Sequence, residues 1–304
     1  MKLRQLQYLW EVYRHGNNMS AAATALHTSQ PGISKQIQQV ESEIGFEVFS
    51  RQRNRIVGLT VPGREAVAIA QRILGDVERL KSLGDDFKSR SRGSLTIATT
   101  HTIARYVLPK AIDKFVKQYP DVRVGLRQGT PTNVCEMVEA GEADIGIGSE
   151  TSRTFPSLTA IPCLTLPRCI VAKADHPLFK TKRLQLAQIA KYPIITYDPA
   201  YSGRWKVLEA FRKAGLEPNI VFGAVDADVS KTYVSLGMGI AILTAVSFDA
   251  GQDKGLRARD ASHLFEPSTI SIRFRTDNYL PDFALDFLKR VSPDANFGSI
   301  RTAR

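Results

Sequence analysis

The residues best suited to specific chemistry lie in the stretch TSQPGISKQIQQVE, residues 28–41. At helical spacing, Gln30, Ser34 and Gln38 share the outward face of a helix, and Lys35 lies beside them. Glutamine can form two hydrogen bonds with adenine, serine can donate or accept, and lysine can reach guanine or a phosphate. The pattern therefore favours a helix that reads DNA bases. A solvated polar face on an ordinary helix is the alternative.

Three short helices would position this face. Within the third, Ile33, Ile37 and Val40 would anchor the helix to the other two, and Gly45 suits the left-handed residue that ends a helix. A tight turn between the second and third helices gives a helix-turn-helix, whose second helix enters the major groove. Apolar residues at helical spacing place the three helices at residues 2–15, 20–26 and 29–44.

Residues beside the third helix add contacts to phosphate. Ser29 and Pro31 lie at its start, where free N–H groups attract anions. The stretch EVFSRQRNRIVGLT then alternates as a two-stranded hairpin, or wing, that carries Arg51, Arg53 and Arg55. The turn and these arginines together favour DNA binding over the alternative. We predict that residues 1–60 form a winged helix-turn-helix domain.

A longer helix follows, predicted from Val61 to about Leu83. A heptad-like seam along it could pair two chains or pack on its own domain, and we favour the dimer because the other faces carry polar residues. The polar stretch KSRSRG at 88–93 would end the linker, so residues 61–90 form a linker and dimerisation segment. The seam residues are Ala66, Ala70, Ile73, Val77 and Leu80.

Residues 91–304 alternate strand-like and helical runs, which indicates parallel strands joined by helical crossovers. Among the runs are SLTIATT, the single helical run IARYVLPKAIDKFVKQ, ADIGIGS, RCIVAKA and PIITYD. The economical division is an α/β half of two subdomains, one made of residues 91–164 and 267–304 and the other of residues 165–266.

Composition sets the class of protein. The chain has 41 Lys and Arg against 30 Asp and Glu, a net charge of +11 that favours polyanionic partners. The N-terminus does not resemble a signal peptide and no apolar run is long enough to span a membrane, so we expect a cytoplasmic protein. Three cysteines without CxxC spacing predict neither a disulfide framework nor a metal site, and we expect them to be small buried residues.

The stretches SAAATALHTSQPGISKQIQQVESEIGFEVFSR and LTVPGREAV resemble the N-terminus of LysR-type transcriptional regulators. The likeness extends over the whole chain, and ATTHTIARYVLP, TYDPAYSGR and IVFGAVDADVSKTYVSLGMG are similar to the CysB branch, which responds to sulfur metabolites. The resemblance implies promoter DNA and RNA polymerase as partners, a dimer that assembles into a tetramer, and an effector half of the periplasmic-binding-protein type.

The resemblance also implies a small-molecule cleft between the two subdomains, lined by Thr100, Thr102, Ile103, Ser149 and Ser202. The residues support this independently, because the two threonines lie between a strand and a helix start, where hydroxyl and N–H groups can hold an anion. Sulfate, an acetylated serine and an adenylated sulfate are the effectors that the branch suggests. No cofactor or metal is predicted.

Several positions depart from the branch. Ile103 stands where a polar amide is common, and only its backbone N–H can hydrogen-bond. Ser149 and Ser202 replace threonines, and Leu166 and Pro167 stand where the branch has an aromatic and a polar residue. The preferred ligand can therefore differ, and a regulator of another pathway with a non-sulfur effector is the alternative.

Other classes of protein fit less well. His101, between two threonines, is the best candidate for a catalytic base, but an ordinary loop histidine is the favoured interpretation. The sequence has no GxxxxGK[ST], HExxH or GxSxG motif, so we predict that the chain is not an enzyme. A solute-binding protein would fit the α/β half but not the helix-turn-helix.

Overall fold

The structure is a computed structural model that describes residues 1–53, 55–86, 93–277 and 280–298, without the side chains of residues 78, 79 and 81–86. The chain divides into two compact units. One comprises Met1–Lys88 with Ala140–Glu142, and the other comprises Ser89–Glu139 with Ala143–Arg304. The predicted linker at 88–93 lies outside the described residues except for Gly93, which begins a strand.

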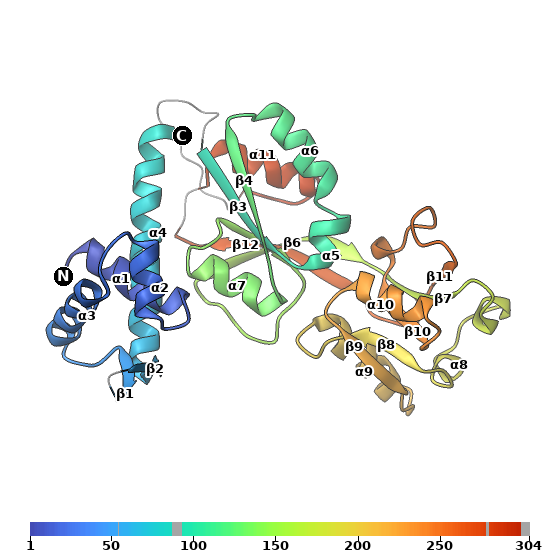
Figure 1. Ribbon diagram of the computed structural model, residues 1–304. Coiled ribbons are helices and arrows are strands. Elements are labelled where there is room, and N and C mark those ends of the chain that lie inside the picture. Colours follow the sequence, from blue (N-terminus) through green and yellow to red (C-terminus); the bar gives the residue numbers. More distant parts are fainter. Residues whose placement is uncertain (54, 87–92, 278–279, 299–304) are drawn as a thin grey trace. The chain divides into compact units, whose positions relative to one another are not determined.

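The first unit begins with three short helices, a two-stranded hairpin and a long helix (Figure 1). All three predicted helices and the wing are confirmed to within about two residues, whereas the long helix continues three residues further than expected. The elements are α1 Leu3–Arg14, α2 Met19–Ala25, α3 Gln30–Ile44, β1 Phe49–Gln52, β2 Arg55–Leu59 and α4 Val61–Asp86.

Apolar periodicity accounts for the packing of this unit. Ile33, Ile37 and Val40 on α3 are fully buried in one core with α1 and α2. The core continues into α4, where Ala70 is 1% exposed and Ile73 packs against it. The first half of the predicted seam is therefore used within the unit, because the interior of a helix-turn-helix needs an apolar cover from α4.

The second unit contains two sheets of five strands (Figure 1). The first has the order β4-β3-β5-β12-β6, with α6 and α11 packed in its larger core and α7 in a smaller one. Its elements are β3 Gly93–Thr99, α5 His101–Tyr106, α6 Pro109–Gln118, β4 Val122–Gln128, α7 Pro131–Glu139, β5 Ile145–Gly148, β6 Leu158–Leu166, β12 Ser268–Arg275 and α11 Asp282–Val291.

The second sheet has the order β11-β7-β10-β8-β9, and α9 and α10 belong to different apolar clusters against it. Its elements are β7 Arg168–Lys173, η1 Pro177–Lys180, α8 Leu186–Ile189, β8 Ile194–Tyr197, α9 Ser202–Lys213, β9 Ile220–Ala224, α10 Ala227–Ser235, β10 Ile240–Thr244, η2 Ala245–Ser247 and β11 Leu256–Asp260.

The sheets differ from the prediction of parallel strands alone. In the first, β12 is antiparallel to both β5 and β6, and in the second β7 is antiparallel to β10 and β11. Strands β6 and β11 were not predicted. The helical run from Ile103 to Gln118 is divided, because Pro109 has no N–H with which to continue α5 and instead begins α6.

Two strands carry the chain between the sheets. The end of β6 leads through Pro167 directly into β7, and β12 begins at Ser268, which pairs with Leu166 across the ladder. The junction therefore brings together residues about a hundred positions apart. The predicted fold class, a winged helix-turn-helix with a two-subdomain α/β half, is confirmed at this level. Among the described residues, no helix is long and apolar enough to cross a bilayer.

Candidate functional site

The polar face of α3 begins at a capped helix terminus. The Ser29 hydroxyl accepts a hydrogen bond from the Gly32 N–H at 3.3 Å, and Pro31 lies in the first turn, where a missing N–H costs nothing. These two features fix where the helix starts. The turn before it requires a positive φ of 50° at His27, which directs the chain from α2 into α3.

The predicted base-reading residues lie beside and opposite the buried stripe of α3. Gln30, Lys35 and Gln38 are exposed, as are Ser29 and Pro31, and Ser34 is half-buried. Because Ile33, Ile37 and Val40 are held in the core, the remaining face is turned to solvent along the helix. The structure thus brings all the predicted α3 residues onto one accessible surface.

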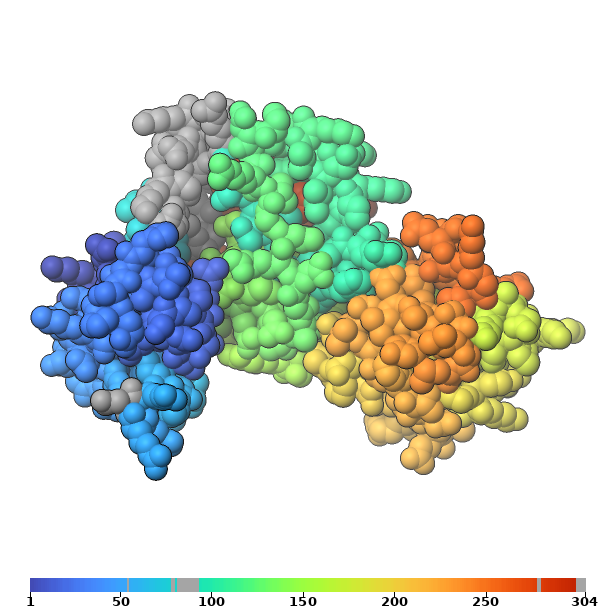
Figure 2. All heavy atoms as spheres, viewed as in Figure 1, coloured from blue at the N-terminus to red at the C-terminus, as the bar shows by residue number. Residues whose placement is uncertain are grey.

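The three wing arginines have different surroundings. The guanidinium of Arg51 donates to Glu41 at 2.8 Å, and the Glu41 carboxylate, only 7% exposed, also accepts the N–H groups of Val48 and Phe49. Arg51 thereby fastens the wing to α3. Arg53 and Arg55 are exposed near the tip of the wing, which Figure 2 shows projecting from the body of the first unit.

A second candidate site is a cavity in the other unit, at the junction of the two sheets. It has about 430 Å³ of empty space, part of it open to solvent. Four of the five predicted effector residues line it, namely Thr100, Thr102, Ile103 and Ser149. Two hydrogen bonds from the Arg273 guanidinium, to the carbonyl oxygens of Gly148 and Ser149, hold the loop that carries Ser149.

Ser202 is the exception among the predicted effector residues. It is 1% exposed and does not line the cavity, whereas its neighbour Gly203 does. A Cβ atom at position 203 would lie 2.8 Å from Cδ2 of Tyr197 and 3.1 Å from Nη1 of Arg168. The start of α9 therefore approaches the cavity by its backbone, which only glycine permits at this distance.

Sequence reasoning missed Arg168. Its side chain is fully buried and lines the cavity, and Nη2 donates to the Ser268 hydroxyl at 2.7 Å. Burial lowers the pKa of Arg168, and the charges of Tyr197 and Glu150 oppose that shift. A charged residue directly before the apolar run CIVA was the available signal, but the strand alone did not indicate a cavity.

Several buried polar atoms around Arg168 lack a hydrogen-bond partner among the described residues. They include Nε and Nη1 of Arg168 itself and the hydroxyls of Tyr197 and Thr244, both of which line the cavity. The hydroxyls of Ser202 and Thr196 are also buried without a hydrogen-bond partner among the described residues. Buried polar groups are rarely left unpaired, so this concentration of donors is suited to a bound anion.

Ion pairs tie the two sheets together beside the cavity. The Lys206 ammonium on α9 contacts Glu150 and the Pro267 carbonyl, and Glu150 also accepts the Thr269 N–H. Burial opposes ionisation of Glu150, but hydrogen bonds from Lys206 and from backbone N–H groups outweigh it and lower its pKa. This contact connects the loop after β5 to α9, which begins at Ser202.

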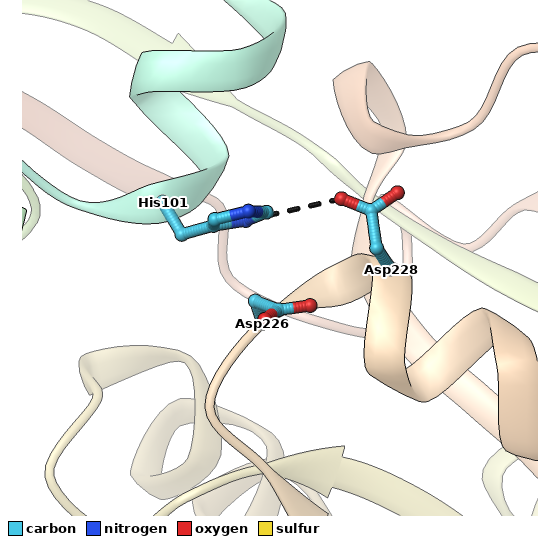
Figure 3. A group of neighbouring side chains, drawn as sticks. All are labelled: His101, Asp226 and Asp228. Carbon is cyan, nitrogen blue, oxygen red and sulfur yellow. Dashed lines mark ion pairs between the residues drawn. The ribbon is translucent and has the colours of Figure 1, made fainter.

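A second contact involves His101, Asp226 and Asp228 (Figure 3). Each offers one atom that could ligate a metal ion, and these atoms lie within 4.8 Å of one another. Asp226 caps α10 through the Val229 N–H. Asp228 accepts from the Tyr106 hydroxyl at 2.6 Å and lies 3.0 Å from the Arg105 guanidinium. These positive and hydrogen-bonding partners suit a contact between α5 and α10 better than a cation site, and they give His101 a structural place rather than a catalytic one.

The cysteines are not paired with one another. Cys135 and Cys169 are buried and Cys163 is half-buried. Burial raises the pKa of Cys163 to about 11 and that of Cys169 to about 12, so both are thiols rather than reactive thiolates at neutral pH. The prediction of small buried residues is confirmed for two of the three.

Two family descriptions match this chain, one in its N-terminal part and one in its α/β half. Residues 3–64 match the family described as bacterial regulatory helix-turn-helix protein, lysR family, and residues 88–294 match the LysR substrate binding domain. The transcriptional regulator CysB of Burkholderia cenocepacia is 43% identical over 97% of this chain and 95% of its own length. The regulator SsuR of the same organism is 41% identical over 99% and 97%.

A solved structure is also similar. The crystal structure of the cofactor-binding domain of the Cbl transcriptional regulator is 38% identical to this chain, with a TM-score of 0.66 over 69% of this chain and 92% of that one. The matched families and these relatives are transcriptional regulators and not enzymes, in agreement with the prediction from the sequence.

Proposed function

The chain belongs to the LysR family of transcriptional regulators, and we propose that it binds promoter DNA under the control of a small anion held around Arg168. The likeness to CysB and SsuR makes genes of sulfur assimilation or sulfonate use the proposed targets. Sulfate, acetylated serines and adenylated sulfate remain the effectors suggested by the branch.

One observation carries the proposal of an anionic effector. Arg168 is fully buried, Nε and Nη1 have no partner among the described residues, and hydroxyl groups surround it in a cavity. A buried charge without a counter-charge is unfavourable, so a bound anion would both satisfy its donors and offset its desolvation. We propose Thr100, Thr102, Ser149 and the backbone at Ile103 as further contacts, with Ser202 acting through its position at the start of α9.

We propose that α3 reads base edges through Gln30, Ser34, Lys35 and Gln38. Ser29 and Pro31 would approach phosphate at the helix start. Exposed arginines at the wing, Arg53 and Arg55, suit phosphate contacts, whereas the pairing of Arg51 with buried Glu41 favours a structural role.

Assembly is also a proposal. The exposed apolar residues Ile69 and Leu80, 42% and 70% accessible, lie eleven positions apart on α4 and so on one side of the helix. We propose that this side, rather than the half-buried Ala66 and buried Ala70, pairs two chains, and that dimers form tetramers and contact RNA polymerase. In functional terms the proposed domains are residues 1–60, 61–90 and 91–304.

The effector proposal is tested by thermal shift of the full-length protein with sulfate, acetylserines and adenylylsulfate, each against chloride at equal ionic strength. A ligand present at a hundred times its dissociation constant adds about 2.7 kcal/mol of stability. Thr100→Val should weaken the best ligand, while Thr96→Val, the same change on β3 outside the cavity, should not. Absence of stabilisation by every anion would contradict the proposal.

The DNA proposal is tested by fluorescence anisotropy with a promoter fragment and a random duplex. Gln30→Ala and Ser34→Ala should reduce discrimination between the two by about 1–3 kcal/mol each. Gln39→Ala, an exposed position outside the proposed set, is the matched control. If both duplexes are bound equally by wild type and variants, α3 does not read sequence.

A further inference from the structure

The lining of the cavity around Arg168 combines polar and apolar residues. Ile103, Leu166 and Ile270 line it, and all three are buried and belong to the larger core of the first sheet of this unit. None of these side chains can hydrogen-bond. An inorganic anion such as sulfate has no group that would gain from contact with such a wall, whereas an apolar substituent would.

The lining also lacks negative charge. Among the described residues, the cavity wall contains Arg168 but no aspartate or glutamate. Glu150, a carboxylate whose charge acts on Arg168, already contacts the Lys206 ammonium and the Thr269 N–H. A ligand that carried an ammonium group would leave it buried without a partner, which is unfavourable. The wall therefore disfavours zwitterionic amino acids.

Resting on the proposed function, we infer that the effector is a small organic anion with a short apolar end and no positive charge. Its anionic head would accept from Nε and Nη1 of Arg168 and from the hydroxyls of Thr244 and Tyr197. Its apolar end would lie against Ile103, Leu166 and Ile270. The geometry specifies this shared chemistry, which alkanesulfonates and short carboxylates both possess.

The junction between β6 and β7 places an apolar and a charged lining residue next to one another in the chain. Leu166 ends β6, pairs with Ser268, and is followed after one proline by Arg168. Ser268 in turn accepts a hydrogen bond from Arg168. The apolar wall and the charge are thus held at a fixed separation by the strand junction, so a ligand must present its head and its apolar end at a matching distance.

Calorimetry on the full-length wild-type protein tests the inference with sulfate, methanesulfonate, ethanesulfonate and propane-1-sulfonate. Each added methylene should tighten binding about fourfold. The matched zwitterion 3-aminopropane-1-sulfonate should bind at least tenfold more weakly than propane-1-sulfonate. Acetate, propionate and butyrate form a parallel series, and the tighter series identifies whether the head is tetrahedral or planar.

Two variants locate the apolar end. Leu166→Ala should weaken propane-1-sulfonate about tenfold and leave sulfate or methanesulfonate nearly unchanged. Leu164→Ala makes the same truncation in the same strand and core, outside the cavity lining, and should leave the series unaltered. The wild-type series is decisive by itself if either variant fails to fold.

The outcomes separate this inference from the proposed function. If sulfate binds and chain length has no effect in either series, the inference is overturned and an inorganic effector stands. If the zwitterion binds as tightly as propane-1-sulfonate, the inference is likewise overturned. If no anion of either series and no sulfate binds, the proposed anion site fails as well.

Discussion

The two proposed binding regions of this protein differ in where they place positive charge. On α3 and the wing, Lys35, Arg53 and Arg55 are exposed on the surface. In the cavity, a single guanidinium, that of Arg168, is fully buried among hydroxyl groups and apolar side chains. The first region suits a long polyanion, whose many phosphates each contribute a little. The second suits one small anion, for which each contact matters.

This difference has consequences for how the regions respond to solution conditions. Exposed charges are screened by salt, so DNA affinity should fall steeply as ionic strength rises. A buried charge in a low-dielectric site is screened far less, and its hydrogen bonds are individually stronger. We therefore expect anion binding to depend little on chloride concentration and strongly on single side chains.

The largest expected effect is on the buried charge. Arg168→Met should weaken the best anion by about 3–6 kcal/mol, because two charge-assisted hydrogen bonds of roughly 1.5–3 kcal/mol each are lost. Basal DNA affinity should be retained, since an apolar side chain of similar size can replace a buried charge without loss of stability. Calorimetry and anisotropy measure the two. Arg257→Met, at an exposed position in the same sheet, is the control. Unchanged anion affinity in Arg168→Met would contradict the view that one buried charge dominates anion binding.

The second largest effect distinguishes two arginines of the wing, Arg51 and Arg53, which are two positions apart in the chain. Arg51→Ala should lower the free energy of unfolding by about 3 kcal/mol, because the buried Glu41 carboxylate would keep its backbone hydrogen bonds but lose its counter-charge. Arg53→Ala should leave stability unchanged and weaken DNA of every sequence alike, with a shallower salt dependence. Urea unfolding and salt titration of DNA binding distinguish them. Equal stability of the two variants would show that the Glu41 contact is not a stabilising one.

A smaller effect is expected at Gly203. Adding a methyl group there would crowd Tyr197 and Arg168, and overpacking of this kind costs about 1–3 kcal/mol. Gly203→Ala should therefore reduce anion affinity and thermal stability together. Gly58→Ala, where the added Cβ meets nothing within 4 Å, should change neither. Full anion affinity in Gly203→Ala would mean that the start of α9 does not approach the ligand closely.

The smallest effect concerns the tie between α5 and α10. Burial opposes ionisation of Asp228, but the Tyr106 hydrogen bond and the charges of Lys231 and Arg105 outweigh it and hold the pKa of Asp228 below its ordinary value of 3.8. Its contribution to stability is thus present above that value and is lost as pH falls through the lower folded pKa. The Tm difference between wild type and Asp228→Asn should shrink only below about pH 4.

Asp113→Asn serves as the control for this titration, because among the described residues Asp113 makes just one ion pair, an exposed one with Lys117. A Tm difference for Asp228→Asn that stays constant down to pH 3 would show that the carboxylate charge contributes nothing to the tie.

Some of this site could be predicted from the sequence because it depends on neighbouring residues alone. The polar face of α3 follows from its spacing, and Thr100 and Thr102 follow from their place between a strand and a helix. Ser202 shows the limit of such reasoning. It was expected in the cleft with the others, yet the close approach of α9 turns its side chain inward and leaves Gly203 at the wall.

By itself, the sequence determined the local elements of this protein: three helices, the wing, the long α4 and most strands of the α/β half. Local periodicity is enough for these, because a helix or strand buries the residues that its own repeat places on one side. The same periodicity could not decide whether Ala70 faces another chain or its own domain, since both partners offer an apolar surface.

Only the tertiary structure decided the rest. Arg168 acquires its buried position because β7 begins where β12 begins, which sets it beside Ser268, a hundred residues further along the chain. Arg51 on the wing is fixed to α3 by the carboxylate of Glu41. Pairings of this kind depend on antiparallel strands and on packing between distant segments, and no spacing within either segment records them.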